Sequence, residues 1–164
     1  MNGQNEGSPR LQVTLADMMP LFQEQLAAGQ KVRFIPHGNS MWPMLRSGRD
    51  AVELSPLPPR LKKYDLPLYQ RACGNYVLHR IVRIAPDGFN CMGDGQLRIE
   101  PGVQKAQMIG VVTAFCREGR WYPITHPGYM LYCRLWPACK LVWRCWKRLR
   151  RVLHRKICNG EEQK

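Results

Sequence analysis

Three side chains in this sequence, a serine, a histidine and an aspartate, could together perform nucleophilic catalysis. Ser40 follows a Gly-Asn turn that can expose its hydroxyl beside backbone amides. His79 interrupts an otherwise hydrophobic run, and Asp94 lies in the turn Met-Gly-Asp-Gly-Gln. Histidine, with an ordinary pKa of about 6.5, can act as a general base near neutral pH, and a carboxylate can orient its ring. The sequence therefore offers a nucleophile, a base and an orienting carboxylate, provided that the fold brings them together.

Each of these residues also has an ordinary structural explanation. A serine in a turn is common, and a lone histidine in a strand is more often a satisfied core residue than a catalyst. His37 adjoins the serine turn, where a surface position is expected, and His126 and His154 show no pattern. A catalytic role for Ser40 is favoured only because the sequence also contains His79 and Asp94, which could act with it.

The positive charge of the chain is concentrated near its C-terminal end. The 164 residues include 25 Lys and Arg against 12 Asp and Glu, a formal net charge of +13, and residues 129–158 contain no carboxylate. No stretch is apolar for long enough to span a bilayer, and the N-terminus lacks the features of a secretory signal, so we expect a cytoplasmic protein. The seven cysteines include no Cys-x-x-Cys pair. We expect them to be reduced, with no metal site and no organic cofactor.

Hydrophobic periodicity predicts a mainly β domain with a helix at each end. The spacing of Leu15, Phe22 and Leu26 predicts a helix over residues 15–28, although Pro20 is unfavourable inside it. Short strands are predicted from two-residue periodicity and intervening Pro- and Gly-rich turns, at 32–34, 51–54, 66–70, 76–84, 89–92 and 109–115. The run 76–84, which contains His79, is apolar on both faces, as in a strand that is covered on each side.

From residue 129 the apolar residues return to helical spacing, which predicts a basic amphipathic helix over 129–158. Three interpretations stay open: binding to an anionic membrane surface, binding to nucleic acid, and packing on the β core with solvated charges. Nine cations exceed what solubility needs, so we favour the membrane and regard nucleic acid as the weaker alternative. The expected lipid or phosphate contacts are Arg144, Trp146, Lys147, Arg148, Arg151 and Arg155.

The serine turn and the segments after it resemble the signal peptidase and LexA-type serine peptidase superfamily. Gly38-Asn39-Ser40-Met41-Trp42-Pro43 resembles its Gly-x-Ser-Met-x-Pro box. Later boxes are similar, in the same order, to Asp50-Ala-Val-Glu-Leu, Lys63-Tyr-Asp-Leu-Pro-Leu-Tyr, Leu78-His-Arg-Ile-Val and Gly93-Asp-Gly-Gln. The His-Arg-Ile sequence is most similar to the endoplasmic-reticulum-type and SipW-like signal peptidases, in which histidine replaces the lysine base. The resemblance covers residues 31–113, most of the predicted β core.

This resemblance implies a serine endopeptidase that hydrolyses a leader or precursor peptide, with Ser40 as nucleophile, His79 as base and Asp94 as the partner of His79. The implied fold is a coiled, mostly antiparallel β barrel. Gly38 and Asn39 belong to the implied oxyanion and substrate site, together with Met41 and Trp42. Trp42 stands where relatives often have an acidic residue, and it either walls a peptide groove or anchors the core.

The chain departs from typical signal peptidases because it has no membrane-spanning segment, and Gly38 stands where many of them have a hydroxyl residue. A non-catalytic protein and an autoproteolytic, LexA-like protein are therefore the alternatives. The bond Ala28–Gly29 is of the kind that LexA-like proteins cut, but a helix C-cap explains the glycine more simply. The predicted organisation is a disordered segment 1–10, a peptidase-like domain 11–128, the basic helix 129–158 and a tail 159–164. We expect a peripheral location at the inner membrane face.

Overall fold

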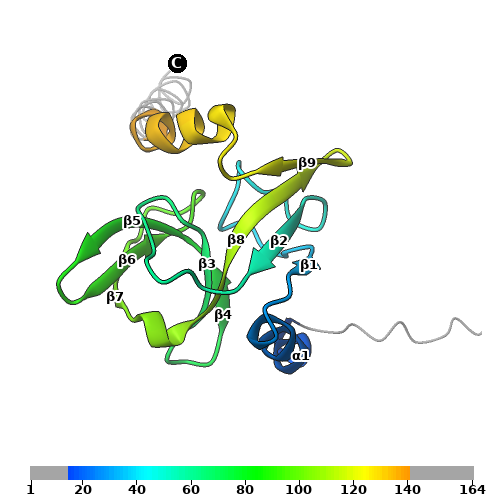
Figure 1. The fold of residues 1–164 in the computed structure, drawn as a ribbon. Helices are drawn as coiled ribbons and strands as arrows, with labels where there is room; N and C mark the ends of the chain where they lie inside the picture. The colour runs from blue at the N-terminus through cyan, green and yellow to red at the C-terminus, as the bar shows by residue number, and fades with distance from the viewer. Residues whose placement is uncertain (1–14, 141–164) are drawn as a thin grey trace, which may run out of the picture. The chain divides into compact units, whose positions relative to one another are not determined.

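The structure, a computed structural model, describes residues 15–140, which are mainly β with a helix near each end (Figure 1). After helix α1 (Leu15–Ala27) come the strands β1 (Val32–Phe34), β2 (Ala51–Ser55), β3 (Pro67–Gln70), β4 (Tyr76–Leu78), β5 (Arg80–Ala85), β6 (Gly88–Met92), β7 (Glu100–Val103), β8 (Met108–Arg117) and β9 (Arg120–Pro123). A short 3₁₀ helix, η1 (Lys105–Gln107), precedes β8.

The strands form two sheets. The first has the order β1-β2-β8-β3-β4, with β9 also paired to β8, and the second has the order β5-β6-β7. The pairs β1–β2, β2–β8, β3–β4, β3–β8, β5–β6 and β6–β7 are antiparallel. The expected mainly β, antiparallel architecture is confirmed. A closed barrel is not formed within residues 15–140, so that part of the expectation is wrong. In the described part of the chain no strand of one sheet is paired to a strand of the other, so the sheets do not close.

Helix α1 forms where the apolar spacing predicts it and buries Met19, Phe22 and Leu26, with Pro20 inside. It ends one residue before the predicted boundary. Gly29 has φ +77°, and its amide donates to the Leu26 carbonyl at 3.0 Å. The next amide reaches back to the Gln25 carbonyl at 2.9 Å, which completes a Schellman C-cap. The bond between Ala28 and Gly29 therefore lies in a helix end that this glycine stabilises.

Every predicted strand segment contains a strand, but the segment 76–84 is divided. Leu78 ends β4 and Arg80 begins β5, so the chain passes from the first sheet to the second at His79. Two strands were not predicted. Strand β7 contains Pro101 and Gly102, which disfavour a strand by propensity. Strand β9 follows a tight turn whose residues Glu118 and Gly119 have φ +53° and +78°, a conformation typical of a type I′ hairpin.

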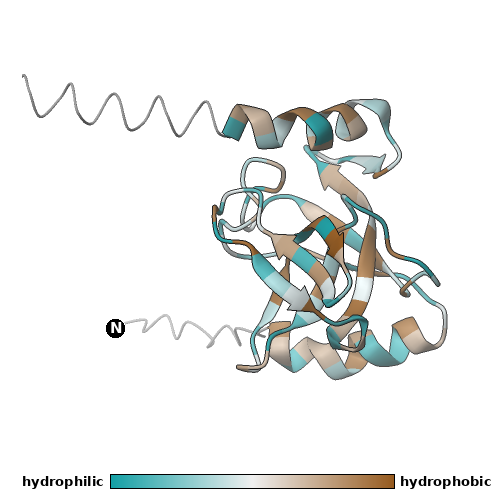
Figure 2. Ribbon diagram, turned by 90° about the vertical axis from the view of Figure 1, so that its left-hand side faces the viewer, coloured by the Kyte–Doolittle hydropathy of each residue, from teal (hydrophilic) through white to brown (hydrophobic). Residues whose placement is uncertain are grey.

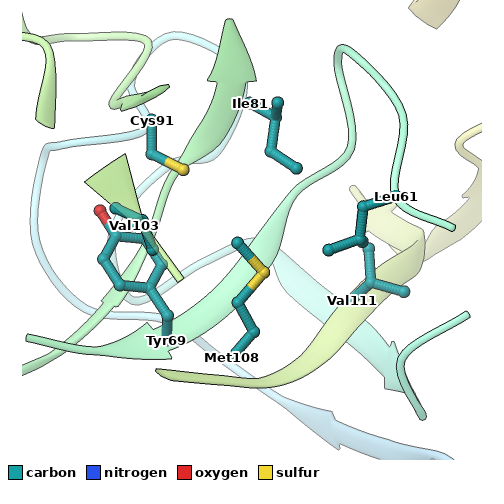
Figure 3. Close-up of a cluster of buried hydrophobic side chains, with 7 residues drawn as sticks. All are labelled: Leu61, Tyr69, Ile81, Cys91, Val103, Met108 and Val111. Atoms are coloured by element: carbon teal, nitrogen blue, oxygen red, sulfur yellow. The ribbon is translucent and has the colours of Figure 1, made fainter. Parts of the chain in front are cut away.

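One hydrophobic cluster joins the two sheets (Figure 3). It takes residues from β3 and β8 of the first sheet and from β5, β6 and β7 of the second, together with a loop residue: Leu61, Tyr69, Ile81, Cys91, Val103, Met108 and Val111. A fully buried aliphatic side chain stabilises a fold by about 1.5–3 kcal/mol. The packing of this cluster therefore helps to hold the second sheet against the first. Backbone hydrogen bonds between Ile81 in β5 and residues 64 and 65, just before β3, add to this contact.

The described chain divides into two compact units, with the boundary between Tyr122 and Pro123. In the second unit, residues 127–140 are helical, so the helix begins two residues before the prediction and continues past Pro137. Figure 2 shows hydrophilic and hydrophobic residues interspersed along it. Among the described residues, no helix is both long and apolar enough to cross a membrane. The predictions for residues 1–10, for the tail 159–164 and for the contacts Arg144, Trp146, Lys147, Arg148, Arg151 and Arg155 lie outside the described residues.

Candidate active site

Ser40 lies in the loop between β1 and β2, at the start of a single helical turn. The turn is closed by a hydrogen bond from the Leu45 amide to the Met41 carbonyl, at 2.9 Å. Met41, Met44 and Leu45 are all buried, whereas Ser40 is half-buried. The apolar side chains anchor the turn, and the serine stays at the surface. Met41 is part of this anchor, and its predicted place at the substrate site stays a prediction.

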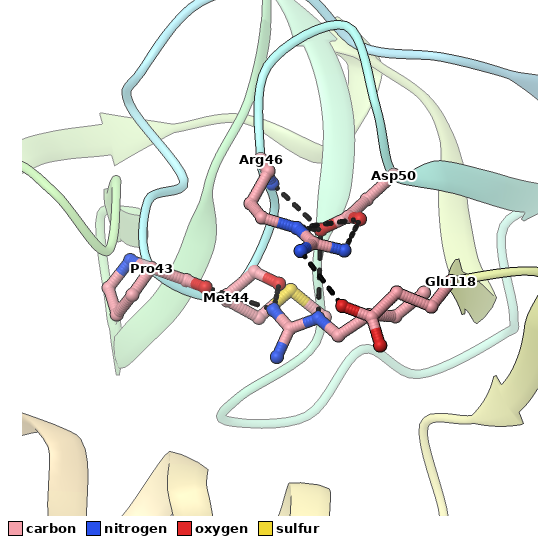
Figure 4. Close-up of polar contacts among 6 residues, drawn as sticks. Pro43, Met44, Arg46, Asp50 and Glu118 are labelled. Atoms are coloured by element: carbon pink, nitrogen blue, oxygen red, sulfur yellow. Dashed lines mark hydrogen bonds and ion pairs between the residues drawn. The ribbon is translucent and has the colours of Figure 1, made fainter.

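A set of ionic contacts fixes the far end of the serine loop (Figure 4). The Asp50 carboxylate is buried and accepts hydrogen bonds from the Arg46 amide at 2.9 Å and from Arg46 Nη2 at 2.8 Å. Burial by itself would raise the pKa of Asp50, but the bonds from Arg46 outweigh burial and lower it. Arg117, at the end of β8, donates to the Pro43 carbonyl at 3.0 Å and also to that of Met44. These contacts connect the loop to β2 and β8, so its position follows from the sheet.

The turn of residues 93–95 packs directly against the serine loop. The Gly95 amide donates to the Ser40 carbonyl at 2.8 Å. A Cβ on Gly93 would lie 2.4 Å from the Ser40 carbonyl oxygen, and one on Gly95 would lie 2.6 Å from that of Asn39. Only glycine fits at either position, because a larger residue would force the two segments apart.

Gly93 also marks the point where Ser40 and His79 meet. The position of a Cβ on Gly93 is 3.1 Å from the Ser40 carbonyl carbon and 3.2 Å from Nε2 of His79. The structure therefore brings two residues that are distant in sequence to the same glycine, with Nε2 as the imidazole nitrogen on the Gly93 side. His79 is fully buried between β4 and β5, with its amide 3.4 Å from the Pro67 carbonyl.

The other ring nitrogen of His79 faces a tyrosine and a glutamate. Nδ1 lies 3.1 Å from the Tyr69 hydroxyl and 3.3 Å from Oε1 of Glu100. The Tyr69 hydroxyl donates to Oε2 of Glu100 at 2.8 Å. Arg71 donates to the same carboxylate, through Nε to Oε2 at 3.0 Å and through Nη2 to Oε1. Glu100 is thus the carboxylate that the structure places at Nδ1.

Asp94 is engaged by a different partner. Nε and Nη2 of Arg80 donate to its two carboxylate oxygens, at 2.8 and 2.6 Å, and both side chains are buried. Nη1 of Arg80 also donates to the Tyr64 carbonyl at 3.3 Å. This bidentate pair connects β5 to the turn that supports Ser40. The role of Asp94 as the partner of His79 stays a prediction.

The sequence pattern does not single out Glu100, because it does not predict strand β7, which begins at this residue. The one signal in the sequence is that Glu100 is the single Asp or Glu in residues 95–117. Nothing in the local pattern around Pro101 and Gly102 indicates a strand that would place it beside His79.

The backbone amides of the serine turn differ in whether they have a hydrogen-bond acceptor within the protein. The Gly38 amide donates to the Ser47 hydroxyl at 2.9 Å, and the Trp42 amide donates to the Asn39 carbonyl at 3.2 Å. Within residues 15–140, no hydrogen bond uses the amides of Asn39 and Ser40 as donors. An oxyanion site needs amides that are not already bonded within the protein, a condition that the amides of Asn39 and Ser40 meet in the described part of the chain and that of Gly38 does not.

An open hollow lies beside the histidine network, lined by residues 95–103 together with Tyr69, Arg71, Ala72 and Gln107. Leu97 and Ile99 on its wall are 53% and 48% exposed, and Trp42 in the serine turn is 45% exposed. Exposed apolar side chains near a catalytic group are suited to contact a ligand. The exposure of Trp42 favours a wall of a groove over a core anchor.

The site therefore combines a half-buried serine, a buried histidine and a carboxylate at the far nitrogen of its ring. Within the described residues, no cluster of side chains could hold a metal ion. Comparison of the chain with protein-family models, with curated proteins and with solved structures finds no match.

Proposed function

We propose that this protein is a serine endopeptidase in which Ser40 is the nucleophile and His79 is the general base. The observation that carries the proposal is that the Ser40 carbonyl carbon and Nε2 of His79 both border Gly93, each within 3.2 Å of the point where a Cβ on that glycine would lie. The histidine is buried and the serine is half-buried, so a substrate can reach the hydroxyl while the base stays shielded from water.

The proposed reaction is an acyl transfer in two steps. The Ser40 hydroxyl attacks the carbonyl carbon of a peptide bond while Nε2 of His79 takes the hydroxyl proton. The amides of Asn39 and Ser40 stabilise the negative oxygen that forms. His79 then protonates the departing amine, which leaves an ester on Ser40. A water molecule, deprotonated by His79, hydrolyses this ester and restores both residues.

The arrangement of the elements supports a signal-peptidase or LexA-type fold. The serine box precedes β2, the histidine lies where the chain changes sheets, and the turn around Asp94 packs on the serine. We propose an extended leader or precursor peptide as substrate, because the open hollow and the exposed Trp42, Leu97 and Ile99 can receive apolar side chains.

The test is a cleavage assay that works without a known substrate. The full chain is incubated with a library of proteome-derived peptides, and new termini are identified by mass spectrometry. We expect termini that appear with the wild type and vanish with Ser40→Ala and with His79→Gln. Ser55→Ala is the matched control, because Ser55 is a buried serine bonded to Thr113 at 2.8 Å and should leave cleavage unchanged. Identical termini from all four proteins, or none from the wild type, would refute the proposal.

We also propose that the basic C-terminal segment holds the protein at an anionic membrane surface, at the inner face of the membrane. Leu131 and Leu135 are 57% and 53% exposed, one helical turn apart, and Met130 is 37% exposed. Residues 129–158 contain nine Lys and Arg and no carboxylate. Exposed leucines beside a dense positive charge fit a surface that is apolar below and negatively charged above. Nucleic acid offers the charge but no apolar layer, so it is the weaker candidate.

A further inference from the structure

The direction in which the Tyr69 hydroxyl donates its hydrogen indicates which ring nitrogen of His79 carries a hydrogen. A tyrosine hydroxyl has one hydrogen to donate. That hydrogen is used in the 2.8 Å bond to Glu100, because a carboxylate can only accept. Toward Nδ1 of His79, at 3.1 Å, the hydroxyl therefore acts as an acceptor. Oε1 of Glu100, at 3.3 Å from Nδ1, is an acceptor as well.

Two acceptors at Nδ1 require a hydrogen on this nitrogen. In a neutral imidazole only one nitrogen carries hydrogen, so the other has the lone pair. The nitrogen with the lone pair is then Nε2, which borders Gly93, the glycine that also contacts the Ser40 backbone. This tautomer is the one that can accept the serine proton.

The charge of Glu100 is maintained by its other partner. Burial alone would raise the pKa of Glu100, but the bonds from Arg71 and then from Tyr69 outweigh burial and lower it. Burial and the bond to Glu100 raise the pKa of Tyr69, so the hydroxyl keeps its hydrogen. Arg71 and Glu100 together carry no net charge. The carboxylate is the member of the pair that lies at Nδ1, so it can stabilise the imidazolium that forms when His79 takes a proton.

We infer that Glu100 is the positioning carboxylate of His79, acting directly and through the Tyr69 hydroxyl, and that Arg71 holds Glu100 in place. This inference rests on the proposed function, because it assigns a purpose to the orientation of His79. It differs from the sequence-based expectation, in which Asp94 has this role. Asp94 is already bonded at both oxygens by Arg80, so its main contribution is to connect β5 to the turn under Ser40.

Two further ionisable groups lie close to the histidine network. The Cys91 thiol from β6 belongs to the cluster that contains Tyr69, and burial raises its pKa to about 12, so it is neutral. Arg80, next to His79 in the chain, is neutralised by Asp94. Glu100 is the charged group that the structure places beside Nδ1, and Arg71 is bonded to its carboxylate.

The first test is nuclear magnetic resonance of the full chain labelled with ¹⁵N and ¹³C in histidine, which reports the tautomer without any substrate. The chain has four histidines, and the His79 signals are those lost in His79→Gln. We expect the Nδ1–H tautomer in the wild type and a population of the Nε2–H tautomer in Glu100→Gln. Glu100→Gln removes the negative charge that lies beside the imidazole ring. The protonated ring is then less stable, so the ring should also titrate at lower pH. An Nε2–H tautomer in the wild type would overturn the inference.

The matched control is Glu53→Gln. Glu53 is also an ion-paired glutamate shielded from solvent, buried where Glu100 is half-buried, and it is bonded to Lys31 and Arg33 at 2.8 and 2.7 Å, but it lies in β2. Its loss should leave the His79 tautomer and titration unchanged. An equal change in both variants would mean that any lost ion pair perturbs the ring, and would also overturn the inference.

The second test measures cleavage of a peptide found with the library. Glu100→Gln should lower kcat/KM on the order of 10²–10⁴-fold and shift the acid limb of its pH profile to lower pH. Glu100→Asp should recover part of the loss. If no peptide is cleaved by the wild type while the tautomer is as expected, the proposed function fails and the network stands. If cleavage and its pH profile are the same in Glu100→Gln, the network fails and the proposed function stands.

Discussion

Replacing Gly93 with alanine tests whether the contact between the serine loop and the turn around Asp94 sets the geometry of catalysis. The new Cβ would lie 2.4 Å from the Ser40 carbonyl oxygen. That is about 0.9 Å closer than the ~3.3 Å at which such carbon and oxygen atoms normally meet. The same Cβ would lie 3.2 Å from Nε2 of His79, which is tight but tolerable. The serine loop, rather than the buried histidine, must therefore give way.

The size of this movement sets the expected loss. A displacement of about 1 Å between reacting groups costs on the order of 10²-fold in rate. Overpacking of a tight contact costs about 1–3 kcal/mol of stability, which is less than the usual 5–15 kcal/mol of a folded domain. We therefore expect Gly93→Ala to stay folded and to cleave roughly 100-fold more slowly.

The assay compares kcat/KM for one peptide from the library with the melting temperature of each variant. The matched control is Gly88→Ala at the first residue of β6, where φ is +130° and a Cβ would lie 2.9 Å from the Val103 carbonyl oxygen. Four strand residues lie between Gly88 and Gly93, so the two positions are about 17 Å apart along the strand. Gly88→Ala should lose stability without losing activity per folded molecule. Normal cleavage by Gly93→Ala, or equal losses of activity in both variants, would refute the reasoning.

Further expected outcomes concern the buried ion pairs and the C-terminal segment. Asp94→Asn, which leaves Arg80 buried without its charge partner, should lower the free energy of unfolding by about 3–5 kcal/mol in urea titrations; an unchanged stability would contradict a structural role for this pair. The pKa of Asp50 is lowered in the folded state, so its stabilisation is present above the unfolded pKa and is lost as the pH falls below about 4. The melting temperature should fall in that range for the wild type and less steeply for Asp50→Asn. The protein should float with liposomes that contain phosphatidylserine but not with neutral ones, and Leu131→Ser with Leu135→Ser should weaken flotation; binding to RNA with no flotation would favour nucleic acid.

Local pattern was sufficient for most of the elements. Helix α1 and the strands β1 to β6 and β8 lie where periodicity and turn residues predict them. The pattern failed at β7, where pairing to β6 overrides the poor strand propensity of Pro101 and Gly102, and at the short strand β9. It also failed at His79, where one apolar run contributes to two sheets. A switch between sheets leaves no mark in hydrophobic alternation, because both halves of the run are buried.

The sequence by itself determined the candidates for chemistry. A serine after a Gly-Asn turn and a histidine in an apolar run are visible as residue types, and so is the concentration of charge in residues 129–158. Tertiary structure decided which residues border one another, and it places the carboxylate of Glu100 3.3 Å from Nδ1 of His79. Asp94 is the carboxylate that the sequence motifs suggest as the partner of His79. In the structure, both of its carboxylate oxygens accept hydrogen bonds from Arg80. Glu100 reaches the ring because antiparallel pairing of β6 and β7 places it opposite Cys91, across the core from Tyr69. Such a relation depends on strand order and register, which a linear pattern does not encode.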